Sequence, residues 1–119
     1  IKTVIMRIMK FVSLEPMQSR GGNPLANQQI LSDDNGSMFV SYGTKICYKT
    51  DKKFNIQGVK RPQYVFDENY WDYSRTTSKY RNDFLGFGVA ECRQGIKEGW
   101  IKLDNLNKKL KSCLAPLFG

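Results

Sequence analysis

Residues 70–86 read YWDYSRTTSKYRNDFLG, and within this stretch the sequence changes from an irregular to a helical pattern. Apolar and small residues recur at spacings of three and four, which places four of them on one face of a helix: Tyr73, Thr77, Tyr80 and Phe84. Either Asp72 or Ser74 can accept hydrogen bonds from the free amides of the first turn. Gly86 and Gly88 can end the helix in a left-handed conformation. The stretch therefore predicts a helix of about three turns.

Aromatic and basic side chains surround the apolar face of this predicted helix. Tyr70 and Trp71 come just before it, and Arg75, Lys79 and Arg81 lie off its apolar face. Such side chains can bind nucleic acid, because aromatic rings stack on bases and cations attract phosphates. The same pattern also fits aromatic core residues beside a solvated charged face. Both interpretations stay open at this point.

Residues 28–49 form the clearest predicted hairpin. Asn35-Gly36 is a preferred pair at the centre of a type I′ turn, where both residues need positive φ. In the outgoing strand one face carries Val40, Tyr42, Thr44, Ile46 and Tyr48, whereas the other face is largely polar and carries Phe39, Ser41, Gly43, Lys45, Cys47 and Lys49. This alternation predicts a sheet with one face on the core and one face toward solvent.

The next segment holds the largest cluster of positive charge. A second turn is predicted at Asp51-Lys52-Lys53 and a third strand at residues 54–59, which ends before Pro62. Residues 45–61 contain one acid and six basic residues, giving a net charge of +5: Lys45, Lys49, Lys52, Lys53, Lys60 and Arg61. A basic hairpin of this kind predicts contact with an anionic partner. Protection of an exposed strand edge against pairing with another sheet explains the same lysines.

The remaining segments are less regular. Residues 2–14 fit a strand or a helix, with their β-branched content favouring a strand. Residues 15–27 are a predicted loop, whose Gly21-Gly22 pair beside Arg20 could cradle a phosphate but lacks the Gly-Lys-Ser/Thr ending of a P-loop. Residues 89–97 predict a helix that ends at Gly99, followed by an extended piece at 100–103. A closing amphipathic helix is predicted from its leucines: Leu103, Leu106, Leu110, Leu114 and Leu117.

These elements predict one α+β domain over residues 1–119, with an antiparallel sheet of three or four strands and two or three helices largely on one face. A hydrophobic fraction of 40% and an aromatic fraction of 13% are typical of a folded chain. The longest apolar run, at residues 4–14, is interrupted by Arg7 and Lys10 and is too short to span a membrane.

The residue types limit the chemistry that we expect. The chain contains no His, so neither a Ser–His–Asp nor a Cys–His arrangement can form within it. Asp67, Glu68 and Asp72 could hold Mg²⁺ through their carboxylates, although acids before a helix are also favoured by the helix dipole. The three cysteines, Cys47, Cys92 and Cys113, form no Cys-x-x-Cys pair, and reduced thiols in a cytoplasm are expected. We expect no enzyme activity, no metal and no cofactor.

The 70–86 stretch also resembles a known group of proteins. Its core W-D-Y-S-x-T-T-x-K-Y-R-N-x-F-L-G, with LEPMQSRGGNPLANQ at residues 14–28 and KEGWIKLDNLN at residues 97–107, is similar to a family of small proteins encoded by bacteriophages of Gram-positive hosts. The match covers residues 71–74, 76–77, 79–82 and 84–86. Phe87 departs from the family, which usually has an acidic residue there. The resemblance implies a phage origin and no particular chemistry.

Three functional hypotheses follow. The first is a phage inhibitor that binds a host defence complex in the bacterial cytoplasm, as anti-CRISPR proteins do, with a Cas9-type nuclease as the leading target. The net charge of +8 disfavours imitation of DNA and favours an acidic protein face or the guide RNA. The second is an accessory module that binds nucleic acid directly through the basic hairpin, with Arg75, Lys79 and Arg81 assisting. A structural phage protein that works as a homo-oligomer is a third possibility, and the sequence does not define the oligomeric state.

Overall fold

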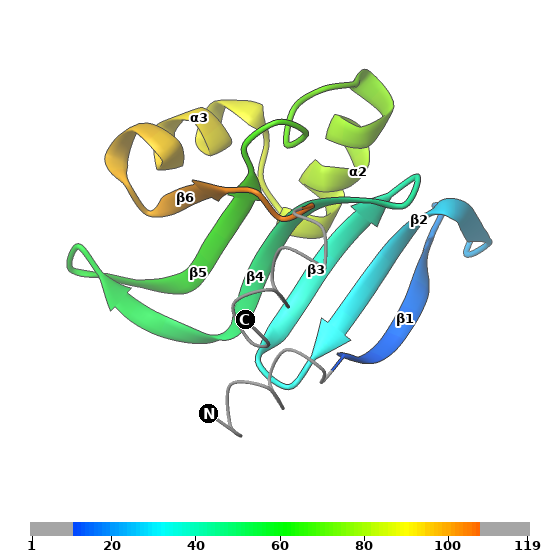
Figure 1. Ribbon diagram of the computed structural model, residues 1–119, viewed down its shortest axis with the longest axis horizontal. Coiled ribbons are helices and arrows are strands. Elements are labelled where there is room, and N and C mark those ends of the chain that lie inside the picture. Colours follow the sequence, from blue (N-terminus) through cyan, green and yellow to red (C-terminus); the bar gives the residue numbers. More distant parts are fainter. Residues whose placement is uncertain (1–10, 108–119) are drawn as a thin grey trace, which may run out of the picture.

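The computed structural model describes residues 11–107, which form a six-stranded sheet with two helices packed against it (Figure 1). The strands lie side by side in chain order, and all neighbours are antiparallel except β5 and β6, which are parallel. The strands are β1 (Phe11–Gln18), β2 (Pro24–Asp33), β3 (Gly36–Ser41), β4 (Thr44–Ile56), β5 (Val59–Asp67) and β6 (Ile101–Asp104). The helices α2 (Arg75–Leu85) and α3 (Val89–Glu98) supply the crossover that a parallel pair requires.

The predicted antiparallel sheet of three or four strands is therefore wrong, because the sheet has six strands and is mixed. Two turns that the sequence pattern does not predict explain part of the difference. Tyr42 and Gly43 have φ angles of 51° and 78°, and Gln57 and Gly58 have φ angles of 54° and 82°. Each pair thus adopts the left-handed backbone of a two-residue hairpin turn. The pattern hid these turns because Tyr and Gln seldom adopt positive φ.

Segments predicted as breaks are continuous strand in the structure. Residues 51–53, predicted as a turn, lie inside β4, where a register shift between Lys49 and Lys53 takes up the irregularity. Pro62, predicted to follow the strand, lies inside β5 opposite Lys53 at the end of this shift. A proline is tolerated there because the ladder is already interrupted. The predicted loop 15–27 is also mostly strand, since β1 ends at Gln18 and β2 begins at Pro24.

The hairpin around Asn35-Gly36 is confirmed, although its turn differs from the predicted one. β2 and β3 pair antiparallel through Ser32 and Ser37, and neither Asn35 nor Gly36 has a positive φ. Instead, the Asp33 carboxylate accepts hydrogen bonds from the amides of Asn35 (2.8 Å) and Gly36 (2.7 Å). Gly36 is needed for another reason: a Cβ there would collide with the carbonyl oxygen of Lys49 on β4.

The helix predicted from residues 70–86 is confirmed as α2. Ser74 is its N-cap, and the Ser74 hydroxyl accepts a hydrogen bond from the Thr77 amide (3.1 Å). Gly86 ends the helix with φ of 84°, as predicted. The inward face differs from the predicted stripe, because it consists of Thr77, Arg81, Phe84 and Leu85, while Tyr73 precedes the helix and is 46% exposed.

The prediction for residues 89–103 is confirmed. α3 ends at Gly99, which has φ of 91°, and the extended piece that follows it is β6. Cys92 on α3 is fully buried. The sequence did not indicate that β6 would join the sheet beside β5, with Tyr64 opposite Ile101.

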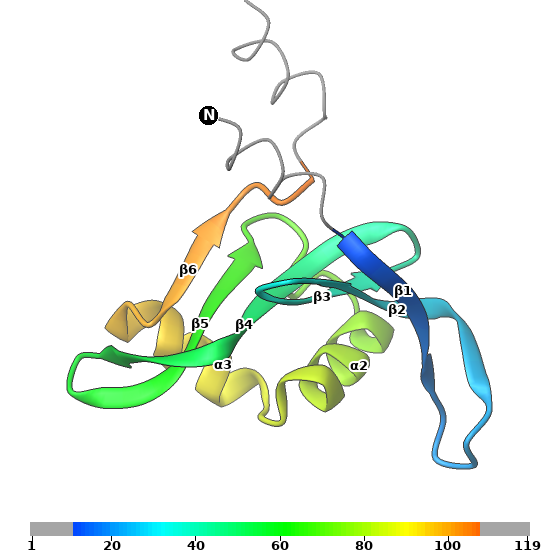
Figure 2. The ribbon, with the colours of Figure 1, turned by 90° about the horizontal axis from the view of Figure 1, so that it is seen from below.

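Both helices lie on the same face of the sheet, as Figure 2 shows. Phe39, Cys47 and Phe66 lie opposite one another on β3, β4 and β5, and all three are fully buried. The ring of Phe84 on α2 stacks on Phe39 with centroids 5.9 Å apart. The predicted position of Phe39 and Cys47 on a largely polar face is wrong, because this face carries the core beneath the helices.

Two predictions fall largely outside the described residues. Of the segment predicted as strand or helix at 2–14, only residues 11–14 are described, and they belong to β1. Of the closing helix predicted from the leucines, Leu103 lies in β6 and Leu106 in the turn after it, and the rest is not described.

Candidate functional site

The β4–β5 hairpin extends beyond the rest of the sheet (Figure 1). We call its outer part, residues 52–61, the β4–β5 arm. Lys52, Lys53 and Lys60 are exposed on it. Two apolar side chains are exposed there as well, with Phe54 at 40% and Val59 at 48%. The arm thus presents three cations and two apolar side chains on one projecting element.

The arm is held to the end of α3 by polar and aromatic contacts. The Gln57 side-chain amide donates a hydrogen bond to the carbonyl oxygen of Glu98 (2.6 Å). The Arg61 guanidinium stacks over the Trp100 ring at 4.2 Å from its centroid. The carboxylate of Glu98 in turn accepts hydrogen bonds from the side chains of Gln94 (2.6 Å) and Trp100 (3.0 Å), which lower its pKa. These contacts give the arm a defined direction relative to the helices.

Lys45 and Lys49 belonged to the predicted basic cluster, but the structure separates them from the arm. The Lys49 ammonium donates a hydrogen bond to the carbonyl oxygen of Phe84 (2.9 Å) and lies 4.7 Å from the centroid of its ring. A cation at the last carbonyls of α2 complements the helix dipole. Lys45 is partly buried, and the Asn107 side chain bonds both its amide and its carbonyl (2.8 Å each).

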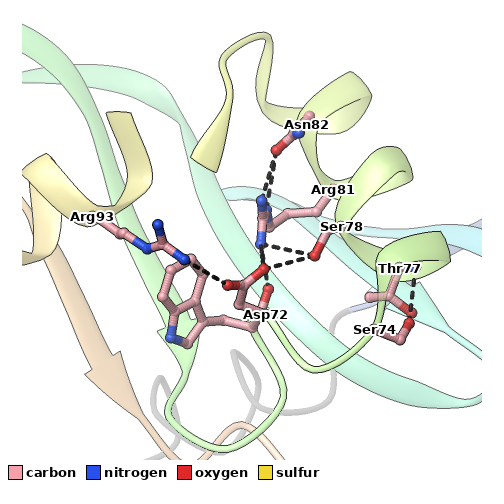
Figure 3. Close-up of polar contacts among 8 residues, drawn as sticks. Asp72, Ser74, Thr77, Ser78, Arg81, Asn82 and Arg93 are labelled. Atoms are coloured by element: carbon pink, nitrogen blue, oxygen red, sulfur yellow. Dashed lines mark hydrogen bonds and ion pairs between the residues drawn. The ribbon is translucent and has the colours of Figure 1, made fainter. Parts of the chain in front are cut away.

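The predicted aromatic and basic site on residues 70–81 is divided in a similar way. Arg81 is fully buried and donates a hydrogen bond to the carbonyl oxygen of Trp71 (2.7 Å). Figure 3 shows its hydrogen bonds to the carboxylate of Asp72 (3.1 Å) and the side chain of Asn82 (2.8 Å). The Trp71 ring lies 5.2 Å from the Arg81 guanidinium and packs on Phe66. These groups join α2 to the loop before it.

The carboxylate of Asp72 contacts three side chains of this network. It accepts hydrogen bonds from Ser78 (2.7 Å) and Arg81, and Arg93 on α3 lies 3.6 Å away (Figure 3). Partial burial acts to raise the pKa of Asp72, but the hydrogen bonds from Ser78 and Arg81 and the two positive charges outweigh it and lower the pKa. The network thus holds Asp72 as a carboxylate.

Tyr70, Arg75 and Lys79 remain on the surface. Tyr70 is 40% exposed and makes an edge contact with Tyr73, with ring centroids 5.3 Å apart. Arg75 and Lys79 project from the exposed side of α2. Lys79 also borders a cleft between α2 and the β1–β2 turn, opposite Arg20. The sequence showed both cations, but not that the turn would lie beside α2.

Two of the three acidic residues considered for Mg²⁺, Asp67 and Asp72, have other partners. Asp67 is fully buried, and its carboxylate accepts hydrogen bonds from the amides of Asn69 (3.0 Å), Tyr70 (2.9 Å) and Leu106 (2.8 Å). It thereby joins the end of β5 to the turn after β6. Residues 11–107 contain no group of three or more His, Cys, Asp or Glu side chains placed to hold a metal ion.

The positive charge of the chain is unevenly distributed. Residues 11–107 hold 13 Lys and Arg and 11 Asp and Glu, so their formal net charge is +2. Residues 1–10 and 108–119 hold six Lys and Arg and no acid. Binding of an anion by the described residues therefore depends on local clusters such as the arm rather than on a general positive field. Within the same residues, no helix is long and apolar enough to cross a membrane.

Comparison with known proteins places the fold in a family. Residues 12–102 match the model of a family of unknown function (DUF8033). The chain belongs to this family. The matched residues take in the β4–β5 arm, the Asp72–Arg81 network and the cleft at Lys79.

Human dynein axonemal heavy chain 10 is 34% identical over 61 residues, which is 46% of this chain and 1% of the dynein chain. The chain thus spans a very small part of that relative. No solved structure matches.

Proposed function

We propose that the protein is a non-enzymatic binding protein with which a phage inhibits a host defence complex, a Cas9-type nuclease being the leading target. The resemblance of residues 71–86 to phage-encoded proteins supports the phage origin. The observation that carries the binding function is the β4–β5 arm with its three exposed lysines and two exposed apolar side chains. The proposed place of action is the cytoplasm of the infected or lysogenic bacterial host, where the free thiols Cys47 and Cys92 stay reduced.

The chemistry of the arm favours a partner that combines negative charge with apolar surface. Burial of Phe54 and Val59 by a partner favours binding by roughly 25 cal/mol per Å² of buried apolar area. Lys52, Lys53 and Lys60 add electrostatic attraction, which speeds association and selects an anionic face. An acidic face of the nuclease or its guide RNA meets the charge condition, and apolar side chains or unstacked bases beside it would cover Phe54 and Val59. Imitation of DNA does not fit, because the arm carries the wrong sign of charge.

A second candidate function is direct binding of nucleic acid as a phage accessory module. The observation that favours it is the exposed ring of Phe54 directly after Lys52 and Lys53 on an extended strand. Single-stranded nucleic acids bind to surfaces of this kind, where bases stack on aromatic rings and cations follow the backbone. In this case affinity falls steeply with salt, because each phosphate contact releases a counterion.

A pull-down from host lysate, with and without nuclease treatment, separates the two candidates. Mass spectrometry then identifies the proteins that stay bound. Recovery of a defence nuclease after nuclease treatment supports inhibition through direct protein contact. Partners that disappear with the nucleic acid support the accessory module instead. If guide-loaded defence complexes neither bind the protein nor lose cleavage activity with it, the inhibitor proposal fails.

A further inference from the structure

We propose that the cleft between the β1–β2 turn and α2 binds a small phosphate monoester that also carries hydroxyl groups, such as a sugar phosphate or a nucleoside monophosphate. The cleft has a volume of about 510 Å³. This volume lies within the usual range for small-molecule sites. Its lining consists of Gln18, Ser19, Arg20, Lys79, Tyr80 and Asp83. The site is separate from the arm and does not depend on the function proposed for it.

Both walls of the cleft rest on the hydrophobic core. Figure 2 shows the β1–β2 turn reaching down beside α2. Met17, just before the turn, and Tyr80 on α2 are both partly buried and pack against the core. The two walls are therefore fixed relative to each other by apolar contacts, and the space between them is part of the fold.

The turn that presents Arg20 is closed by its own hydrogen bonds. The Ser19 amide donates to the carbonyl oxygen of Asn23 (2.8 Å), and the Ser19 hydroxyl accepts from the Asn23 amide (3.2 Å). The Gly22 amide donates to the carbonyl oxygen of Ser19 (2.9 Å), and Gly22 has φ of 84°. Arg20 thus projects from a defined turn, which reduces the entropy cost of holding a ligand.

The charged side chains at the cleft are not paired with one another or with other charges of residues 11–107. Within residues 11–107, Arg20, Lys79 and Asp83 form no ion pair, whereas the ion pairs that exist there join Asp72 to Arg81 and Arg93. Two cations from elements far apart in the sequence border the same space. A planar guanidinium can donate two parallel hydrogen bonds to a phosphate, and an ammonium adds a point charge. Together they suit a phosphate group.

The remaining lining residues indicate what the phosphate is attached to. An ionised carboxylate such as Asp83 only accepts hydrogen bonds, so a ligand beside it needs donors. Asp83 also repels a bare anion, which disfavours inorganic phosphate alone. Tyr80 supplies a flat aromatic wall, over which the Lys79 ammonium lies at 5.3 Å from the ring centroid. A sugar attached to the phosphate provides the hydroxyl donors and a surface to lie on the ring.

The test is calorimetric titration of the full chain with ribose 5-phosphate, adenosine 5′-monophosphate, adenosine and inorganic phosphate. We expect the two phosphate esters to bind with Kd values of about 1 mM or below and adenosine not to bind. Arg20→Ala and Lys79→Ala should each lower the affinity for the esters by about 10-fold or more, since each removes a charged contact. The matched control is Arg75→Ala, which removes an exposed cation from the same helix outside the cleft and should change nothing.

Asp83→Asn tests the assignment of the donor groups. The variant should bind the esters more weakly, because it loses a strong hydrogen-bond acceptor. It should bind inorganic phosphate more tightly, because it loses a repelling charge. The proposal is overturned if neither ester shows saturable binding, if adenosine binds as well as its monophosphate, or if Arg20→Ala and Lys79→Ala bind as the parent does.

Discussion

The buried guanidinium of Arg81 donates a hydrogen bond of 3.1 Å to the carboxylate of Asp72, nine residues earlier in the chain. The same guanidinium also donates hydrogen bonds to the carbonyl oxygen of Trp71 and to the side chain of Asn82 (Figure 3). One side chain of α2 therefore holds Trp71 and Asp72 of the loop that precedes the helix. The residues that make the 70–86 stretch so recognisable in the sequence are mainly those that hold the fold together.

The shape of Arg81, and not only its charge, should matter for stability. In Arg81→Lys the ammonium cannot reach Trp71, Asp72 and Asn82 together, because it lacks the planar fork. We expect the free energy of unfolding to fall by about 2–3 kcal/mol, as charged hydrogen bonds are lost in a buried site. Urea denaturation measures this directly. Arg75→Lys on the exposed side of the same helix should stay within about 0.5 kcal/mol of the parent, and an equal loss in both variants would contradict this role of Arg81.

Acid should weaken the protein partly through Asp72. Its pKa in the folded state is lower than the ordinary value of 3.8, so the unfolded chain binds its proton first as the pH falls. The contribution of Asp72 to stability is therefore complete above pH 3.8 and is lost as the pH falls toward the lower pKa of the folded state. Urea denaturation at a series of pH values should show a shallower acid loss for Asp72→Asn than for the parent. Equal slopes would show that Asp72 makes no such contribution.

Gly36 should be the least replaceable glycine of the sheet. In Gly36→Ala the new methyl group meets the carbonyl oxygen of Lys49, so β3 and β4 must separate locally. We expect destabilisation of about 3 kcal/mol, at the upper end for overpacking. Gly43→Ala makes no collision and costs only the left-handed backbone, about 1–2 kcal/mol. Thermal or urea unfolding of both variants measures the two losses of stability. A larger loss for Gly43→Ala than for Gly36→Ala would contradict the prediction.

The thiols of Cys47 and Cys92 should react slowly in the folded protein. Both are fully buried, and burial raises the pKa of each thiol, so little thiolate is present at neutral pH. In a Cys113→Ser variant, we expect a thiol reagent to label both thiols of the folded protein only as fast as the sheet and helices separate. In urea, where the chain is unfolded, labelling should be rapid. Fast labelling of either thiol without denaturant would contradict the packing between sheet and helices.

The local elements were more predictable from the sequence than their assembly. Helices α2 and α3 followed from apolar spacing and from Gly86 and Gly99, because these signals lie within a few residues of one another. The sheet was underestimated because Tyr42 and Gln57 adopt positive φ in turns, against their usual preference. The place of β6 beside β5 depends on a crossover of more than thirty residues, which no local pattern encodes.

The candidate sites show the same division. Charge counting found the basic hairpin, and exposed Lys52, Lys53 and Lys60 remain together on the arm. It could not show that Lys49 turns inward to Phe84, or that Arg81 is fully buried. The sequence does not distinguish a charged side chain that is exposed to solvent from one that is buried and hydrogen-bonded inside the protein. The cleft between Arg20 and Lys79 was hidden for a related reason, since its walls meet only in the folded sheet.

The most direct test of the β4–β5 arm as the binding surface is to measure the equilibrium Kd of the protein for a guide-loaded Cas9-type nuclease. Free nucleic acid is first removed from the sample by nuclease treatment. Two variants with equal change of charge are compared, Lys53→Glu with Lys60→Glu on the arm and Arg75→Glu with Lys97→Glu on the helices. We predict that the arm variant binds at least about 10-fold more weakly than the parent, which corresponds to about 1.4 kcal/mol, while the helix variant binds as the parent does. Equal affinity of the arm variant and the parent would contradict the assignment of the arm.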